Sequence, residues 1–151
     1  MGKDPYAGGL LTFNPFAERR LLTGEIVTVL DGRLLNRGIE LLHARSRVLK
    51  KYEIHELILT LEPGAEPGTQ VNRVCYLGFF EVQQGAVIVA GDEVRIGEKW
   101  QGKVVGYDET HVPNHINIVV TGEEEKTGLE LRLQVGDRIQ FIPTGERNDK
   151  K

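Results

Sequence analysis

The stretch AVIVAGDEVRIG, residues 86–97, indicates the fold class of this chain. Two short runs rich in β-branched residues are separated by Gly91-Asp92 and followed by Gly97-Glu98. β-Branched residues fit the pleated surface of a sheet, and glycine beside an acidic residue favours a turn. The same pattern of short apolar runs bounded by turn residues continues on both sides, which predicts an all-β protein.

Working outward from this stretch, the sequence contains further runs of the same kind. Asp31-Gly32 stands between two apolar runs and predicts a β-hairpin turn. Many short strands with turn residues between them are typical of a barrel or a sandwich. The expected strands are 25–30, 55–61, 71–82, 86–90, 93–96, 103–107, 116–120, 129–135 and 138–142.

The chain of 151 residues is organised as one domain with two extensions. Residues 1–20 contain prolines and glycines among isolated apolar residues and are expected to form an irregular arm, in which Phe13 and Phe16 can pack. Residues 21–143 form the expected barrel domain, and 144–151 form a polar tail. Within 38–55 the apolar spacing fits both a helix and a strand, so one short helix in 38–52 is allowed.

Composition excludes several classes of protein. The net charge of −3 argues against a general nucleic-acid-binding protein, which needs a basic surface to displace counterions. The basic cluster 45–51 and the acidic cluster 123–125 are expected to be solvated. The single cysteine, Cys75, excludes a multi-cysteine zinc site and is expected in the core. Neither a signal peptide nor a membrane-spanning apolar run is recognised, so a cytoplasmic protein is expected.

The stretch GYDETHVPNH, residues 106–115, is the candidate site. It holds two of the four histidines, two adjacent acids and an asparagine, and it leads directly into the strand expected at 116–120. Polar loops on a rigid scaffold commonly carry function. The candidate binding residues in this loop are Tyr107, Asp108, Glu109, His111, Asn114 and His115.

A metal centre is one interpretation of this loop. Imidazole is a good ligand for zinc, copper, iron and nickel. Because Pro113 disfavours a helix, His111 and His115 would converge through a turn, with Asp108 or Glu109 as a third ligand. His43 or His55 could add a ligand from another strand. The alternative is that both histidines are structural or contact a small molecule or a protein partner, and no cofactor is then expected.

The segment 57–142 resembles a known family. The residues that carry the resemblance occur in the same order and spacing: LILTLEPGA at 57–65, GAV at 85–87, GDEVRIG at 91–97, VVG at 104–106, HINI at 115–118 and VGDRIQF at 135–141. Together they resemble the glucitol/sorbitol-specific IIA component of the bacterial sugar phosphotransferase system. The resemblance covers a little over half of the chain and implies a small closed Greek-key β-barrel.

The same resemblance implies a departure from the chemistry of that family. Its phosphoryl-accepting histidine lies in a His-x-His segment just before the Gly-Ala turn, where this chain has YLGFF, residues 76–80. Gly78 and Phe80 stand at the two histidine positions, and a phosphohistidine requires an imidazole nitrogen. We therefore expect the scaffold without phosphohistidine transfer, with Gly78, Phe79 and Phe80 as an apolar wall beside the 107–115 loop.

Three functional hypotheses follow. The preferred one is a non-catalytic binding or regulatory module for a small molecule or a protein. The second is a metal-dependent enzyme with His111 and His115 as ligands and Asp108 or Glu109 as a third ligand or general base. The third is a structural protein that self-associates into a homo-oligomer through the N-terminal arm and an exposed sheet edge.

Overall fold

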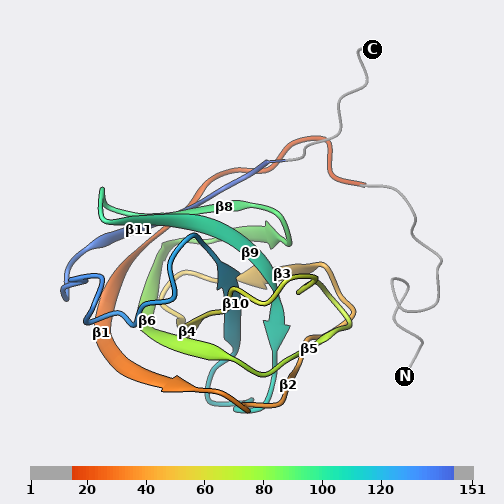
Figure 1. Ribbon diagram of the computed structural model, residues 1–151. Helices are drawn as coiled ribbons and strands as arrows, with labels where there is room; N and C mark the ends of the chain where they lie inside the picture. The colour runs from red at the N-terminus through yellow and green to blue at the C-terminus, as the bar shows by residue number, and fades with distance from the viewer. Residues whose placement is uncertain (1–14, 145–151) are drawn as a thin grey trace.

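The computed structural model describes residues 15–144 and shows a closed β-barrel (Figure 1). The barrel contains seven strands in the order β1-β11-β8-β9-β10-β4-β6, with β1 and β6 closing the ring. The strands are β1 (Leu22–Leu34), β2 (Ile39–Glu40), β3 (Ser46–Leu49), β4 (Ile54–Leu59), β5 (Gln70–Val71), β6 (Val74–Gln84), β7 (Ala86–Val89), β8 (Glu93–Ile96), β9 (Trp100–Asp108), β10 (Asn117–Thr121) and β11 (Arg138–Ile142).

The predicted all-β barrel is confirmed, and its connectivity contains a Greek key. Strands β8, β9 and β10 follow one another as antiparallel neighbours, and β11 returns to pair with β8. This order, with the fourth strand beside the first, defines the motif. Strands β10 and β4 are parallel neighbours, which brings two segments that are far apart in sequence side by side.

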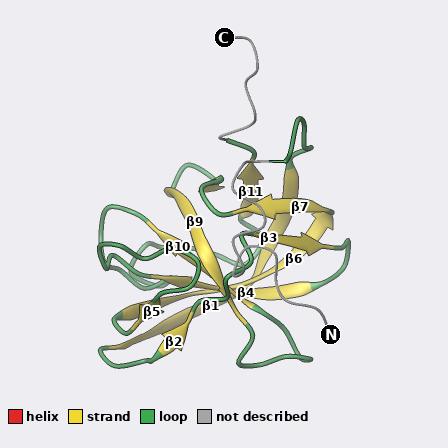
Figure 2. Cartoon of the chain, turned by 90° about the vertical axis from the view of Figure 1, so that its right-hand side faces the viewer, coloured by secondary structure: helices red, strands yellow, loops and turns green. Residues whose placement is uncertain are grey.

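Two small sheets lie outside the barrel. Strand β2 pairs with β5, and β3 pairs with β7. Figure 2 shows these two pairs apart from each other, with β3 and β7 above and β2 and β5 below. Within residues 15–144 there is no helix long and apolar enough to span a membrane.

The barrel interior and the cover of its outer face form two separate apolar clusters. The larger cluster fills the barrel and includes Leu57, Phe80, Tyr107 and Ile118. The smaller one joins Ile58 and Val119, on the outer face of β4 and β10, to residues of β2 and β5. Side chains of a strand alternate between its two faces, so both faces of β4 and β10 are buried. This double burial leaves polar residues on the outer face shielded from water.

Three local predictions were wrong. Residues 38–52 contain β2 and β3 and no helix. The apolar spacing there fits a helix and a strand equally, and pairing with β5 and β7 favours the strands. Asp31-Gly32 lies inside β1 rather than at a hairpin, since β1 pairs with β6 beyond this point through an irregular register. Residues 129–135 form turns, in which Leu131 N–H donates to the Thr127 carbonyl.

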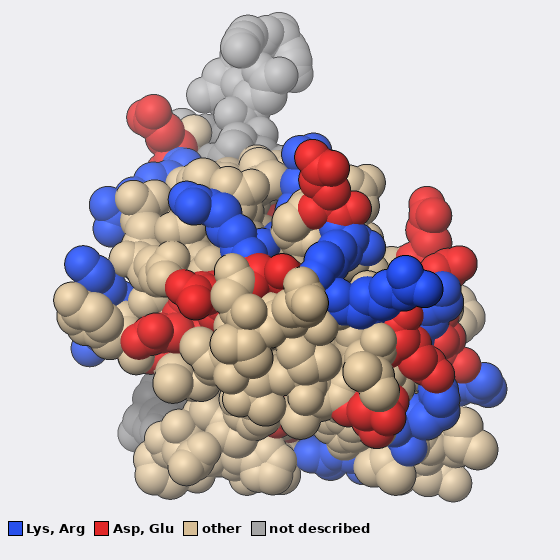
Figure 3. Space-filling model, turned by 90° about the vertical axis from the view of Figure 1, so that its left-hand side faces the viewer, with Lys and Arg blue, Asp and Glu red and all other residues tan. Residues whose placement is uncertain are grey.

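Other sequence predictions can be compared with the structure. Cys75 is buried, as expected, and burial raises the pKa of its thiol. Lys and Arg side chains are interspersed with Asp and Glu on the face shown in Figure 3, so neither sign dominates it. Phe13 lies outside the described residues, and Phe16 packs against the Arg19 guanidinium. The barrel is closed and has no free strand edge, so within residues 15–144 the free edges belong to the two small sheets.

Candidate metal centre on the outer face of the barrel

The connection between β9 and β10 folds into a compact turn that brings two histidines together. The backbone N–H groups of Asn114 and His115 donate to the His111 carbonyl at 2.8 and 3.3 Å. At the start of the turn, the Asp108 carboxylate accepts the Thr110 hydroxyl at 2.8 Å. The His111 and His115 rings consequently stack, with their centroids 5.1 Å apart. We expected Pro113 to disfavour a helix here, and residues 110–114 form turns rather than a helix.

Beneath this turn, a row of side chains crosses four strands on the outer face of the barrel. In the strand registers, Phe79 of β6 is opposite Glu56 of β4, Glu56 is beside Asn117 of β10, and Asn117 is opposite Asp108 of β9. Paired residues project to the same side of a sheet. Glu56, Asn117 and Asp108 are all buried. The row is therefore a polar strip held on rigid strands.

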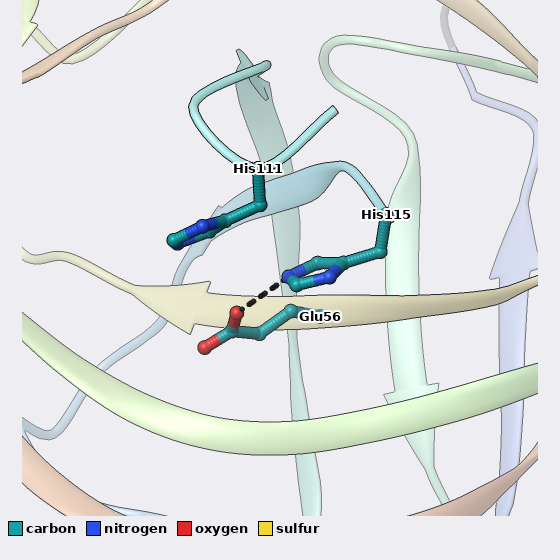
Figure 4. A group of neighbouring side chains, drawn as sticks. All are labelled: Glu56, His111 and His115. Carbon is teal, nitrogen blue, oxygen red and sulfur yellow. Dashed lines mark hydrogen bonds and ion pairs between the residues drawn. The ribbon is translucent and has the colours of Figure 1, made fainter. Parts of the chain in front are cut away.

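His115 joins the turn to this strip (Figure 4). Its Nε2 lies 3.1 Å from Glu56 Oε1, and its Nδ1 lies 2.6 Å from Asn114 Oδ1. The edge of the Phe79 ring packs against the imidazole, with centroids 5.0 Å apart. Both ring nitrogens thus face oxygen atoms that accept hydrogen bonds. Since a neutral imidazole has one N–H, it can donate to only one of them.

A metal ion between Nε2 and Oε1 would complement both atoms. With Nδ1–H donating to Asn114, the Nε2 lone pair is available as a ligand. Metal-bound histidines commonly donate their other N–H to a carbonyl or carboxylate oxygen, which fixes the ring orientation. Two ligand atoms on a tetrahedral zinc ion are about 3.3 Å apart, close to the observed 3.1 Å.

His111 could supply a third ligand atom. One nitrogen of His111, one of His115 and one oxygen of Glu56 all lie within 4.8 Å of one another. These distances between ligand atoms are longer than those in a tetrahedral metal site. The exposed His111 ring would therefore have to rotate away from the His115 ring to coordinate the same ion. Two imidazoles and one carboxylate form a donor set found for zinc and for non-haem iron(II).

Asn117 adds a further polar atom next to the cluster. Its Nδ2 donates to Asp108 Oδ2 at 2.7 Å, which fixes the orientation of the amide because a carboxylate accepts hydrogen bonds. Its Oδ1 is buried and has no hydrogen-bond partner among the described residues. Buried polar oxygens are rarely left in this state. A water molecule or another donor at this position would satisfy it.

The other residues expected in the site have separate partners. Asp108, expected as a metal ligand, binds Thr110 and Asn117 and does not belong to the three-donor cluster. Glu109 forms an ion pair with Arg47 at 2.6 Å. Tyr107 points into the barrel, where its hydroxyl donates to the Ile88 carbonyl at 3.2 Å and burial raises its pKa.

The expected apolar wall is only partly present. Phe79 contacts His115, whereas Phe80 is fully buried in the barrel core. Gly78 offers no surface, because a Cβ atom there would lie 2.3 Å from the Thr28 carbonyl oxygen. Position 78 therefore admits no side chain without a backbone shift.

Neither of the other two histidines joins the cluster. His55 Nδ1 accepts the Ile116 N–H at 3.1 Å, and its Nε2 lies 3.0 Å from Glu53 Oε1. His43 is exposed and lines a different cavity of about 650 Å³ near Gly68.

The contact with His55 affects the pKa of Glu53. Burial by itself would raise this pKa, but hydrogen bonds from His55 and the Lys50 N–H lower it below its usual range.

Glu56 is the residue that sequence reasoning missed. Its signal was a single acid inside the apolar run HELIL, residues 55–59. A charged side chain is seldom buried without a partner, so this acid required an explanation. The sequence did not indicate which histidine it would meet, because Glu56 and His115 are 59 residues apart and approach through the parallel β4–β10 pair.

Comparison with known proteins identifies the family. The model of DUF6917, a family of unknown function, matches residues 16–142, and the chain belongs to this family. No curated protein and no solved structure matches the chain. The match spans all the strands of the barrel and all three residues of the cluster.

Proposed function

We propose that this member of the DUF6917 family is a binding module for a divalent first-row transition-metal ion, held by Glu56, His111 and His115. The observation that carries the proposal is the approach of their three donor atoms to within 4.8 Å of one another. The hydrogen bond between His115 and Asn114 supports it, because it orients the ring with Nε2 toward Glu56. Zinc and iron(II) both suit this donor set.

The module would not transfer phosphoryl groups as the glucitol/sorbitol IIA component does. This part of the proposal rests on the sequence resemblance and is supported by the close packing at Gly78. An imidazole at that position would require the Thr28 backbone to move. Incubation with a labelled phosphohistidine donor should leave the protein unlabelled, and stable labelling of His111 or His115 would contradict the proposal.

The central experiment measures zinc binding by calorimetry and metal content by elemental analysis. The wild-type protein should bind about one equivalent. The double variant His111→Ala/His115→Ala should lose the bound metal, and Glu56→Gln should weaken binding by at least about tenfold because a charged ligand is removed. Binding should weaken as the pH falls, since protons compete with the metal for its ligands.

His43→Ala is the matched control, because it removes an exposed imidazole outside the cluster. It should bind zinc as the wild type does. The proposal is wrong if the folded wild-type protein binds no zinc, cobalt(II), nickel(II) or iron(II). It is equally wrong if the double variant retains the metal.

A metal-dependent hydrolase is the second candidate function. Three protein ligands leave a coordination position open, which is typical of catalytic zinc sites. Asn117 Oδ1, which has no partner among residues 15–144, could accept a hydrogen bond from a water at such a position. Zinc-loaded protein should then hydrolyse p-nitrophenyl acetate faster than Glu56→Gln does. If the two rates are equal while the wild type binds zinc, the hydrolase hypothesis is wrong and only the metal-binding function remains.

A further inference from the structure

Another cavity lies on a different part of the molecule, beside the β3–β7 sheet. Its volume is about 810 Å³, within the range of small-molecule sites. We call it the β3–β7 cavity. Its lining comes from the segment before β1, from β3 and the residues after it, and from the connection between β6 and β7: Phe16, Glu18, Arg19, Arg20, Val48, Leu49, Lys50, Lys51, Gln83, Gln84, Gly85, Ala86 and Val87.

Part of the lining of this cavity is apolar. Val48, Ala86 and Val87 line it from the paired strands β3 and β7, and Phe16 lines it from the segment before β1. Leu49, which also lines it, is only 1% exposed. Gly85 keeps the connection in close contact with β3, because a Cβ atom there would lie 2.7 Å from the Leu49 carbonyl oxygen. The cavity can therefore bury the apolar body of a ligand.

A buried ion pair fixes one wall. Arg19 donates to both oxygens of Asp92 at 2.7 Å and to the Val87 carbonyl at 2.9 Å. The Arg19 and Asp92 side chains are only 5% and 1% exposed. Bidentate pairs of this kind hold both groups in one geometry. The segment that carries Phe16 is thus fastened to the turn after β7, and the wall is formed before any ligand binds.

The rim of the cavity is cationic. Arg20, Lys50 and Lys51 line it together with one acid, Glu18, whereas the whole chain carries a net charge of −3. Arg20 Nε donates to the Gly85 carbonyl at 2.9 Å, which places its guanidinium beside the cavity. Neither lysine forms an ion pair with a described residue. A positive rim around an apolar cavity is complementary to a ligand with an apolar body and an anionic head group.

We infer that the β3–β7 cavity binds a small amphiphilic anion. The apolar body would lie against Val48, Ala86 and Val87, and a carboxylate, sulfonate or phosphate would lie between Arg20, Lys50 and Lys51. Arginine and lysine both bind such head groups, arginine through its planar fork and lysine through its charge. This site is independent of the metal centre, since no residue lines both.

Two probes test the chemistry of the ligand. Anilinonaphthalene sulfonate is an apolar anion that fluoresces on transfer out of water. It should bind the full-length protein, and its binding should saturate. Decanoate should displace it, and decanol should do so at least about tenfold less well, a difference of about 1.4 kcal/mol. Amide chemical shifts measured by NMR should change at residues 49–51 and 84–87.

Matched lysine variants test the rim. Lys50→Gln/Lys51→Gln should weaken probe binding about tenfold. The control Lys103→Gln/Lys126→Gln removes the same charge outside the cavity and should bind as the wild type does. Urea unfolding should show that both variants remain folded, because the probe also binds partly unfolded proteins.

Three outcomes would overturn the inference. The first is equal probe affinity in the two lysine variants. The second is displacement by decanol as efficient as displacement by decanoate. The third is a protein that sediments as a dimer and dissociates when the probe binds, which would assign the cavity to a second copy of the chain.

Discussion

His55 belongs to strand β4 and His115 contacts the same strand through Glu56, but the two rings have different hydrogen-bonding surroundings. His55 has one donor and one acceptor beside it, the Ile116 N–H and the Glu53 carboxylate. A neutral imidazole satisfies both. His115 has two acceptors beside it, Asn114 Oδ1 and Glu56 Oε1, and a neutral ring can satisfy only one of them.

This difference separates a structural histidine from a candidate ligand. His55 is 7% exposed and joins the ends of two strands through a completed pair of hydrogen bonds. At His115, a metal ion between Nε2 and Glu56 Oε1 would interact favourably with both atoms, and His111 places a second imidazole beside it. Whether a histidine near this strand is a candidate metal ligand therefore depends on the hydrogen-bonding partners of its ring, and not on how many histidines are close by.

Apart from variants of the three proposed metal ligands, His55→Ala is expected to have the largest effect, which is a loss of stability. The change leaves the buried Ile116 N–H without its acceptor and opens a cavity, so the free energy of unfolding should fall by about 2–3 kcal/mol. Urea unfolding measures this loss. Zinc affinity of the folded variant should be unchanged, and a loss of zinc would mean that His55 belongs to the metal site after all.

Asn114→Ala should have an intermediate effect, on zinc affinity. Removing the oxygen that accepts His115 Nδ1–H frees the ring to rotate, and affinity should fall about tenfold. Calorimetric titration gives this ratio. The matched control is Asn36→Ala, at an exposed asparagine that is distant in sequence from Asn114, and this variant should bind zinc as the wild type does. Identical affinities in the two variants would show that Asn114 does not orient the ligand.

The smallest effect concerns acid sensitivity at Glu53. Its pKa in the folded protein lies below the ordinary 4.5. A lowered carboxyl pKa contributes stability above that ordinary value and loses it as the pH falls through the folded value. Glu53→Gln should therefore lose less stability than the wild type between neutral pH and about pH 3.5, by less than about 1 kcal/mol because the group is partly exposed.

Urea unfolding of both proteins at the two pH values checks this last prediction. Glu98→Gln, at an exposed acid in the turn between β8 and β9, serves as the control and should follow the wild type. An equal acid response in Glu53→Gln and the wild type would show that the Glu53–His55 contact contributes nothing to the pH dependence.

Local patterns in the sequence predicted the barrel because most strands carry their own signal. The runs 86–90 and 93–96 became β7 and β8, with Gly91-Asp92 between them as a turn. Asp31-Gly32 misled for a physical reason. The Asp-Gly pair favours a turn locally, but β1 pairs with β6 on both sides of it, through an irregular register, and this pairing keeps the chain extended.

The candidate site was predicted in part. The spacing of His111 and His115 and the presence of Pro113 correctly placed both imidazoles in one turn. Asp108 was expected as the third ligand because it is close in sequence. The Asp108 carboxylate instead binds Asn117 and Thr110, and the carboxylate that lies near both imidazoles is that of Glu56, from another strand.

By itself, the sequence determined that this chain is an all-β barrel and that two histidines share a turn, because strand patterns and turn residues act over a few neighbours. The tertiary structure alone decided what those histidines meet. The parallel register of β4 and β10 places Glu56 beside Asn117 and under His115, 59 residues away in sequence. Such a register is selected by the apolar residues that it buries on both faces, Leu57 and Ile118 inside and Ile58 and Val119 outside. No local pattern around Glu56 contains that information.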